Sequence, residues 1–234
     1  MDNDKIYKCV IPLGMRCFTE MFIKELKLKK FSMTFDAMFS KDIDSIIEIM
    51  ENDIEYDNLI YSENIKNYQL TELHNNHGFR TLHKNDYDEN NLLSSFHMAF
   101  LPHHNLNDPN VRKHFKKCFV RLNKIKRNNI NTLFTLFICP NYANDKNITI
   151  NDINKLAIYL KNNYTCRLLV CLFKKTNNSY DVSKIIDDNN LIYFHINSNS
   201  YNFTDHKNIL NNIMNYLHIK PNNLLEYNDI ENLH

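Results

Sequence analysis

The run TLFTLFIC at residues 132–139 contains no charged side chain, no glycine and no proline. A strand that is apolar on both of its faces is typical of a parallel sheet with helices packed on its two sides. Two later stretches are nearly as apolar, RLLVCLF at 167–173 and LIYFHI at 191–196. Three buried strands in succession predict an α/β fold in which helices connect the strands.

Helical patterns lie between and around these strands. Apolar residues at helical spacing give a long amphipathic helix over 111–127. Thr149 with Asp152 resembles a capping box and predicts the start of a helix that leads to the next strand. A last helix is expected over 205–217. The sequence therefore predicts a three-layer α/β fold, with a mostly parallel sheet flanked by helices.

The N-terminal part repeats this alternation. IYKCVIPL at 6–13 predicts a buried strand, and apolar residues recur at helical spacing over 17–28. An aromatic-rich connection, FSMTFDAMF at 31–39, leads to Ser40, which can cap a further helix. Periodicity is weak after that helix, so we expect an irregular insertion near residues 52–107.

Composition sets the broad class of the protein. The chain has 234 residues, 43% of them hydrophobic, and a formal net charge of +1, which is typical of a globular protein without bulk attraction to nucleic acid or anionic membranes. No Pro/Gly/Ser-rich linker divides residues 1–234, so we expect a single α/β domain. The N-terminal MDNDKIYK carries charges where a signal peptide needs an apolar core, and no apolar run is long enough to span a bilayer. We therefore expect a cytoplasmic location, in the producing cell or in a host, and no membrane partner.

Residue usage also bears on origin and cofactors. Abundant asparagine, isoleucine and lysine are typical of AT-rich coding DNA, as in a large DNA virus or an AT-rich microbe. The chain has only two glycines, Gly14 and Gly78, with which neither a GxGxxG nor a GxxxxGK[ST] motif can be written. Glycine-dependent dinucleotide and P-loop sites are therefore excluded, and no cofactor is expected.

Gly14 lies between the first predicted strand and Cys17, which falls in the first turn of the next helix. A turn without a Cβ can bend sharply and can admit a substrate. Free N–H groups and the helix dipole favour the thiolate, which is the reactive form of a cysteine. The alternative is that Cys17 is a small residue buried at a crowded turn. The other five cysteines form no CxxC pair and are expected to be free thiols: Cys9, Cys118, Cys139, Cys166 and Cys171.

Several short motifs accompany Cys17. LGMRC at 13–17 is followed by KLKKFSMTFDAMF at 27–39 and later by His97. With these motifs the chain resembles, over most of its length, a family of uncharacterised proteins described as papain-like cysteine peptidases. The resemblance implies a thiol-dependent hydrolase in which Cys17 is the nucleophile, His97 the base that deprotonates it and Asp36 an orienting acceptor. Asp36 has a second interpretation, as the cap of a helix or turn.

Further positions are predicted to bind a ligand. Gly14 and Arg16 lie in the turn before Cys17, and Arg121 matches a basic helix of the family. His195 lies near the carboxyl end of the last predicted strand, where it could line the same cleft. The substrate stays open between a small molecule and a peptide, because a parallel C-terminal half suits acyl or glycosyl compounds equally well.

Alternatives to a Cys17–His97 enzyme follow from departures in the motifs. Pro12 stands where the family has serine, Ala37 where it has tryptophan, and a methionine follows His97 where the family has aspartate. A non-catalytic interaction protein with a protein partner therefore stays open. His103 or His104 is an alternative partner for the thiol.

The sequence contains two other clusters of side chains that could bind a ligand or a metal ion, one basic and one of histidines. The helix at 111–127 is rich in lysine and arginine, which indicates either a solvated face or a surface for phosphate, sugar or nucleic-acid ligands. His74, His77 and His83 lie close together in the sequence, but no fourth ligand occurs at a familiar spacing. We therefore predict no metal site.

Overall fold

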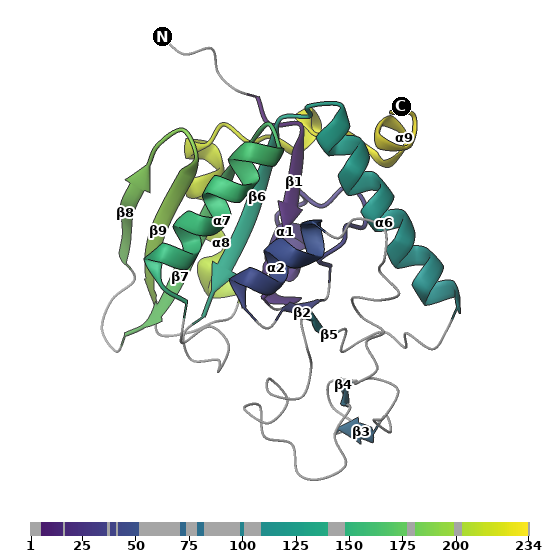
Figure 1. The fold of residues 1–234 in the computed structure, drawn as a ribbon. Helices are drawn as coiled ribbons and strands as arrows, with labels where there is room; N and C mark the ends of the chain where they lie inside the picture. The colour runs from purple at the N-terminus through teal and green to yellow at the C-terminus, as the bar shows by residue number, and fades with distance from the viewer. Residues whose placement is uncertain are drawn as a thin grey trace.

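A five-stranded sheet lies at the centre of the computed structural model (Figure 1). Its strand order is β1-β6-β7-β9-β8; the first four strands run parallel, and β8 runs antiparallel at one edge. The strands are β1 (Cys9–Pro12), β6 (Thr132–Ile138), β7 (Cys166–Lys175), β8 (Asp181–Asp187) and β9 (Leu191–Ser198). The structure describes residues 6–15, 17–36, 38–40, 42–51, 71–73, 79–81, 99–100, 109–139, 148–176, 181–198 and 203–233.

Helices cover both faces of this sheet. Successive side chains of a strand point to opposite faces, so Phe134 and Leu136 of β6 pack into one core while Leu133 and Phe137 pack into the other. The first core is completed by α2 (Ile43–Glu51), α6 (Pro109–Arg127) and α7 (Ile150–Asn163), and the second by α1 (Cys17–Glu25) and α8 (Phe203–Tyr216). The prediction of a three-layer α/β fold with a mostly parallel sheet is confirmed. None of the helices in the described ranges is both long and apolar enough to cross a membrane.

Two short ladders lie outside the main sheet. β2 (Phe39–Ser40) pairs antiparallel with β5 (Ala99–Phe100), and β3 (Thr71–Leu73) pairs antiparallel with β4 (Phe79–Thr81). The carboxyl end of β1 points toward β2 and β5 (Figure 1). The rest of the insertion expected near 52–107 lies outside the described residues, as do the histidines proposed for it: His74, His77, His83, His103 and His104.

Some elements differ from the sequence prediction. β8, the 3-10 helix η1 (Pro221–Asn223) and α9 (Tyr227–Glu231) are not predicted. The side chains of β8 are mostly exposed because it is an edge strand, so it lacks the apolar run that reveals its neighbours. Helix α2 is capped by Asp42, whose Oδ1 accepts a hydrogen bond from the N–H of Ser45 at 2.7 Å, and not by Ser40 as predicted.

The capping box of α7 gives a first test of the fold. Thr149 Oγ1 accepts from the N–H of Asp152 at 3.2 Å, and the Asp152 carboxylate accepts from the N–H of Thr149 at 2.8 Å. Thr149→Ala removes one of these acceptors, so urea denaturation should show a loss of about 1 kcal/mol in the free energy of unfolding. Asn151→Ala, in the same turn but outside the box, should change that free energy by less than about 0.5 kcal/mol. Equal losses in the two variants would contradict the capping role.

Candidate active site

Gly14 joins β1 to α1 and packs directly against the connection at 31–39. A Cβ at this position would lie 2.8 Å from the carbonyl oxygen of Phe35 and 2.9 Å from that of Met38. The N–H of Ser40 donates to the carbonyl oxygen of Gly14 at 2.9 Å. Glycine is required here because another stretch of backbone occupies the space of a side chain, whereas the sequence alone suggested the approach of a substrate.

The ladder of β2 and β5 extends this contact. Ser40, which donates to Gly14, is also the register partner of Ala99 in β5. The Gly14 turn, the connection and β5 are distant in the sequence and meet beyond the carboxyl end of β1. We call this meeting point the Gly14 junction.

Asp36 lies in the connection and is only 7% exposed. Its Oδ2 accepts a hydrogen bond from the N–H of Met33 at 2.8 Å and pairs with Nζ of Lys29 at 2.8 Å. Lys29 also forms an ion pair with Glu20 of α1. Oδ1 of Asp36 is buried and has no hydrogen-bond partner within the part of the chain that the structure describes. Asp36 therefore caps a local turn and still offers one acceptor atom.

The surroundings of Asp36 change its ionisation. Burial raises its pKa to about 6, although Lys29 and the N–H of Met33 favour the carboxylate. Burial lowers the pKa of Lys29, but the nearby carboxylates of Asp36 and Glu20 outweigh this effect and its pKa is raised. Lys29 is therefore a cation at neutral pH, while Asp36 titrates close to the physiological range.

Cys17 is the first residue of α1, as predicted. Its backbone N–H is one of those at a helix start that no carbonyl of the same helix can satisfy. The side chain of Cys17, and the whole of Arg16 and His97, lie outside the described residues. The roles of Cys17 and His97 and the ligand-binding role of Arg16 therefore stay predictions.

Comparison with known families adds an independent observation. The sequence profile of a family described as "Putative papain-like cysteine peptidase (DUF1796)" matches residues 8–167. The chain belongs to this family. The match contains Cys17, Asp36, His97 and Arg121, and it ends before His195. No curated protein and no solved structure matches the chain.

The remaining cysteines of this family member are poor nucleophiles. All five are free thiols, and four are buried while Cys166 is partly buried. Burial raises the pKa of Cys9, Cys118 and Cys166 to about 12 and also raises the pKa of Cys171. Since the thiolate is the reactive form, these groups are inert near neutral pH.

One of these thiols has a histidine beside it. Nε2 of His114 lies 3.8 Å from Sγ of Cys118 on α6. This pair was not predicted from the sequence, although its i, i+4 spacing on a helix places the two side chains on one face. Burial of the Cys118 thiol rules out a nucleophilic role, so a histidine contact alone does not mark a catalytic cysteine.

Arg121 is buried on α6 and makes contacts within the protein. Its Nε donates to Oε1 of Glu231 at 2.7 Å, and its Nη1 donates to the carbonyl oxygen of Ser32 at 3.0 Å. The guanidinium also lies 4.8 Å from the ring centroid of Tyr227. Arg121 thus links α6 to α9 and to the connection that bears Asp36. Its ligand-binding role stays a prediction.

His195 lies apart from the Gly14 junction. β9 is separated from β1 by β6 and β7, which corresponds to about 14 Å across the sheet. Nε2 of His195 is 3.0 Å from the hydroxyl oxygen of Tyr193, a residue of the core on the α7 side of the sheet. Burial lowers the pKa of His195. The structure does not bring His195 together with the start of α1, and its predicted ligand role is untested.

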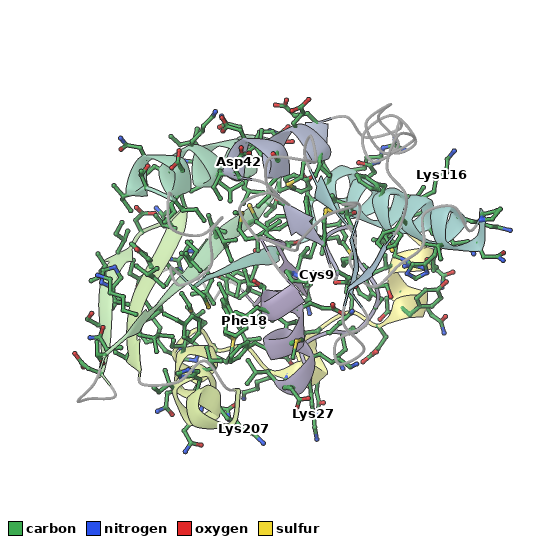
Figure 2. The ribbon with its side chains drawn as sticks, turned by 90° about the horizontal axis from the view of Figure 1, so that it is seen from below. Cys9, Phe18, Lys27, Asp42, Lys116 and Lys207 are labelled. Carbon is green, nitrogen blue, oxygen red and sulfur yellow. The ribbon has the colours of Figure 1, made fainter. Side chains whose placement is uncertain are left out.

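Some basic side chains of helix α6 form hydrogen bonds within the protein. Lys124 donates to the carbonyl oxygen of Glu231 at 2.6 Å, and Lys126 donates to Asn163 at 3.1 Å. Lys116 projects from the outer side of the helix (Figure 2), and Lys113 and Lys117 are also exposed. Fewer basic side chains of α6 are therefore available to bind a ligand than the lysine and arginine content of the helix indicates.

Three side chains near the site were missed by the sequence analysis. Glu20 and Lys29 form the ion pairs described above. Glu20 lies three residues after Cys17 on the same predicted helix, and this spacing could have identified it as a residue near the thiol. His206 is fully buried, with its ring centroid 5.0 Å from that of Phe173, which also contacts Phe18 of α1. An isolated histidine on a predicted helix gives no sequence signal for such packing.

The close approach at Gly14 predicts that even a methyl group is costly there. In Gly14→Ala the new Cβ must displace two backbone carbonyls, so the free energy of unfolding should fall by about 1–3 kcal/mol. Amide exchange at Ser40 should also become faster, because its N–H donates to Gly14. Urea denaturation and hydrogen exchange measure these effects, and an unchanged denaturation midpoint would contradict the packing.

The raised pKa of Asp36 predicts a pH-dependent contribution to stability. The folded protein holds the proton up to pH of about 6, whereas the unfolded chain loses it near pH 4. The contribution of Asp36 is therefore fully present below pH 4 and is lost as the pH rises through 6. The unfolding free energy of wild type minus that of Asp36→Asn should fall by on the order of 2 kcal/mol between pH 4 and pH 7. Denaturant titrations across this range measure it, and a constant difference would refute the assignment.

Proposed function

We propose that the protein is a thiol-dependent hydrolase or transferase in which Cys17 is the nucleophile, His97 its base and Asp36 the acceptor that orients His97. The observation that supports this proposal is the Gly14 junction. The start of α1 bears Cys17, the connection bears Asp36, and β5 follows His97 by two residues. Three segments that are distant in the sequence meet there: two of them bear a required group, and the third begins two residues after His97.

Chain connectivity limits how far His97 can lie from the junction. Two residues of extended chain span at most about 7 Å, so this is the upper limit between the Cα atoms of His97 and Ala99. Ala99 is the register partner of Ser40, which donates to Gly14. An imidazole on this stretch is therefore a reasonable partner for a thiol at the start of α1.

Asp36 offers what an orienting group needs. Its Oδ1 is buried and lacks a partner among the described residues, while its Oδ2 is held by Met33 and Lys29. A buried acceptor without a donor costs free energy, which an N–H group of an imidazole would recover. The carboxylate could then fix the ring orientation of His97, as in other nucleophile–base pairs that have a third group.

The chemistry proposed is acyl transfer through a thioester. His97 takes the thiol proton, and the Cys17 sulfur attacks the electrophilic carbon of the substrate. The negative charge that develops on the substrate oxygen faces free N–H groups at the start of α1. His97 returns the proton to the leaving group, and water or another acceptor then cleaves the thioester. The family description favours a peptide substrate, and the open parallel sheet suits other acyl compounds as well.

Labelling with iodoacetamide tests the nucleophile. The thiols of the other cysteines are inert near neutral pH, so the native protein should incorporate one label, at Cys17, with an apparent pKa below the usual value of about 8.5. Mass spectrometry after native labelling across pH 5–10 identifies the site, and Cys17→Ser should remove the label. If all six cysteines react only after denaturation, the enzyme proposal fails.

Substitution of histidines identifies the base within the same experiment. His97→Gln should raise the apparent pKa of Cys17 toward the usual value, because the imidazolium no longer stabilises the thiolate. His103→Gln and His104→Gln are matched controls and should leave the pH profile unchanged. A shift in either control, with none in His97→Gln, would assign the base to the other histidine.

A further inference from the structure

The geometry points to Lys29 as a positioning residue of the proposed active site, whose ammonium group links the segment that bears Asp36 to the helix that begins at Cys17. This inference rests on the proposed function and adds a residue to it. Nζ of Lys29 lies 2.8 Å from Oδ2 of Asp36 and also contacts Oε1 of Glu20. One cation therefore bridges two carboxylates from two different segments.

The bridge is largely shielded from water. The side chains of Lys29, Glu20 and Asp36 are 18%, 17% and 10% exposed. Ion pairs with so little exposure are screened weakly by salt, and loss of one partner leaves an uncompensated charge. The attraction between Lys29 and Asp36 is therefore stronger than that of an ion pair on the protein surface.

The position of Glu20 connects this bridge to Cys17. The two residues are three apart in α1, so they lie on neighbouring positions of one helix face. Without Lys29, the carboxylates of Glu20 and Asp36 would both disfavour a thiolate at the start of this helix. Lys29 offsets that repulsion and keeps Asp36 in place.

Other charged groups face the bridge from α6. His114 interacts electrostatically with Lys29, and the thiol of Cys118 interacts with both Lys29 and Asp36, while Arg121 acts on His114 and Cys118. Arg121 is already paired with Glu231, and burial lowers the pKa of His114. Cys118 stays protonated because burial raises its pKa to about 12. Within the described residues, Lys29 is therefore the cation that directly contacts both carboxylates.

The test measures the apparent pKa of Cys17 by iodoacetamide labelling in four variants. Lys29→Met should raise it by about one pH unit, whereas Lys29→Arg should keep it near the wild-type value. Glu20→Gln should lower it, because one negative charge is removed while Lys29 still holds Asp36. Lys30→Met is the matched control, since this neighbouring lysine is similarly shielded but pairs with Glu226, whose side chain is exposed, and it should leave the pKa unchanged. If Lys29 had only a structural role, Lys29→Met and Glu20→Gln would not shift the thiol pKa in opposite directions.

A second readout separates this inference from the proposed function. Carbon-13 NMR of the Asp36 carboxyl should show a higher pKa in Lys29→Met than in wild type, because Lys29 favours the carboxylate. If wild-type Cys17 has an ordinary pKa, the proposed function fails, and the Asp36 titration still tests the bridge. If wild-type Cys17 is activated but Lys29→Met matches Lys30→Met, the role of Lys29 is refuted and the proposed function stands. Should Lys29→Met not fold, an unchanged thiol pKa in Glu20→Gln refutes the inference equally.

Discussion

The packing of Gly14 against the carbonyl oxygens of Phe35 and Met38 is the constraint on which the candidate site depends. β1 is an edge strand of the main sheet, and an uncovered edge exposes unpaired backbone groups. The connection at 31–39 packs against the turn that follows this strand, where only a residue without a Cβ leaves enough space. The same contact fixes β2, and through β2 the start of β5. A single close approach of backbone to backbone therefore brings together the turn before α1, the connection that bears Asp36 and, through β2, the strand β5.

Ion pairs and hydrogen bonds of charged side chains also hold the connection in place. Lys29 links the connection to α1, and Arg121 links it to α6 and to the C-terminal helix. Buried ion pairs contribute little net stability, because removing the charges from water offsets much of their attraction. They do require specific partners, so they fix one geometry of the connection in a way that apolar contacts would not. The raised pKa of Asp36 is a consequence of the burial that this geometry imposes.

The sequence predicts those parts of the fold that burial makes visible. β6, β7 and β9 are apolar on both faces, and Thr149 with Asp152 marks the start of α7 by a local pattern. β8 escapes prediction because its side chains are exposed, and the Arg121–Glu231 pair escapes because its partners are 110 residues apart. His195 shows a different limit: a residue near a carboxyl strand end is a reasonable candidate, but strand order, which the sequence does not reveal, separates it from β1. The family motifs singled out Asp36, and its second interpretation as a turn cap agrees with its bond to the N–H of Met33. Its partner Lys29 lay within the same motif and carried no signal of its own.

The parallel sheet also bears on how the family description should be understood. A cysteine at the start of a helix after the first strand can be activated by the helix start and an imidazole alone, without the architecture of any particular peptidase. Under the proposed function, the chemistry depends on the residues of the junction, and the sheet is the support that holds them. The inert thiols elsewhere in the described core reinforce this view, because their burial leaves them protonated even where, as at Cys118, a histidine lies beside the sulfur. What distinguishes Cys17, the proposed nucleophile, from the other cysteines is therefore its place at a helix start.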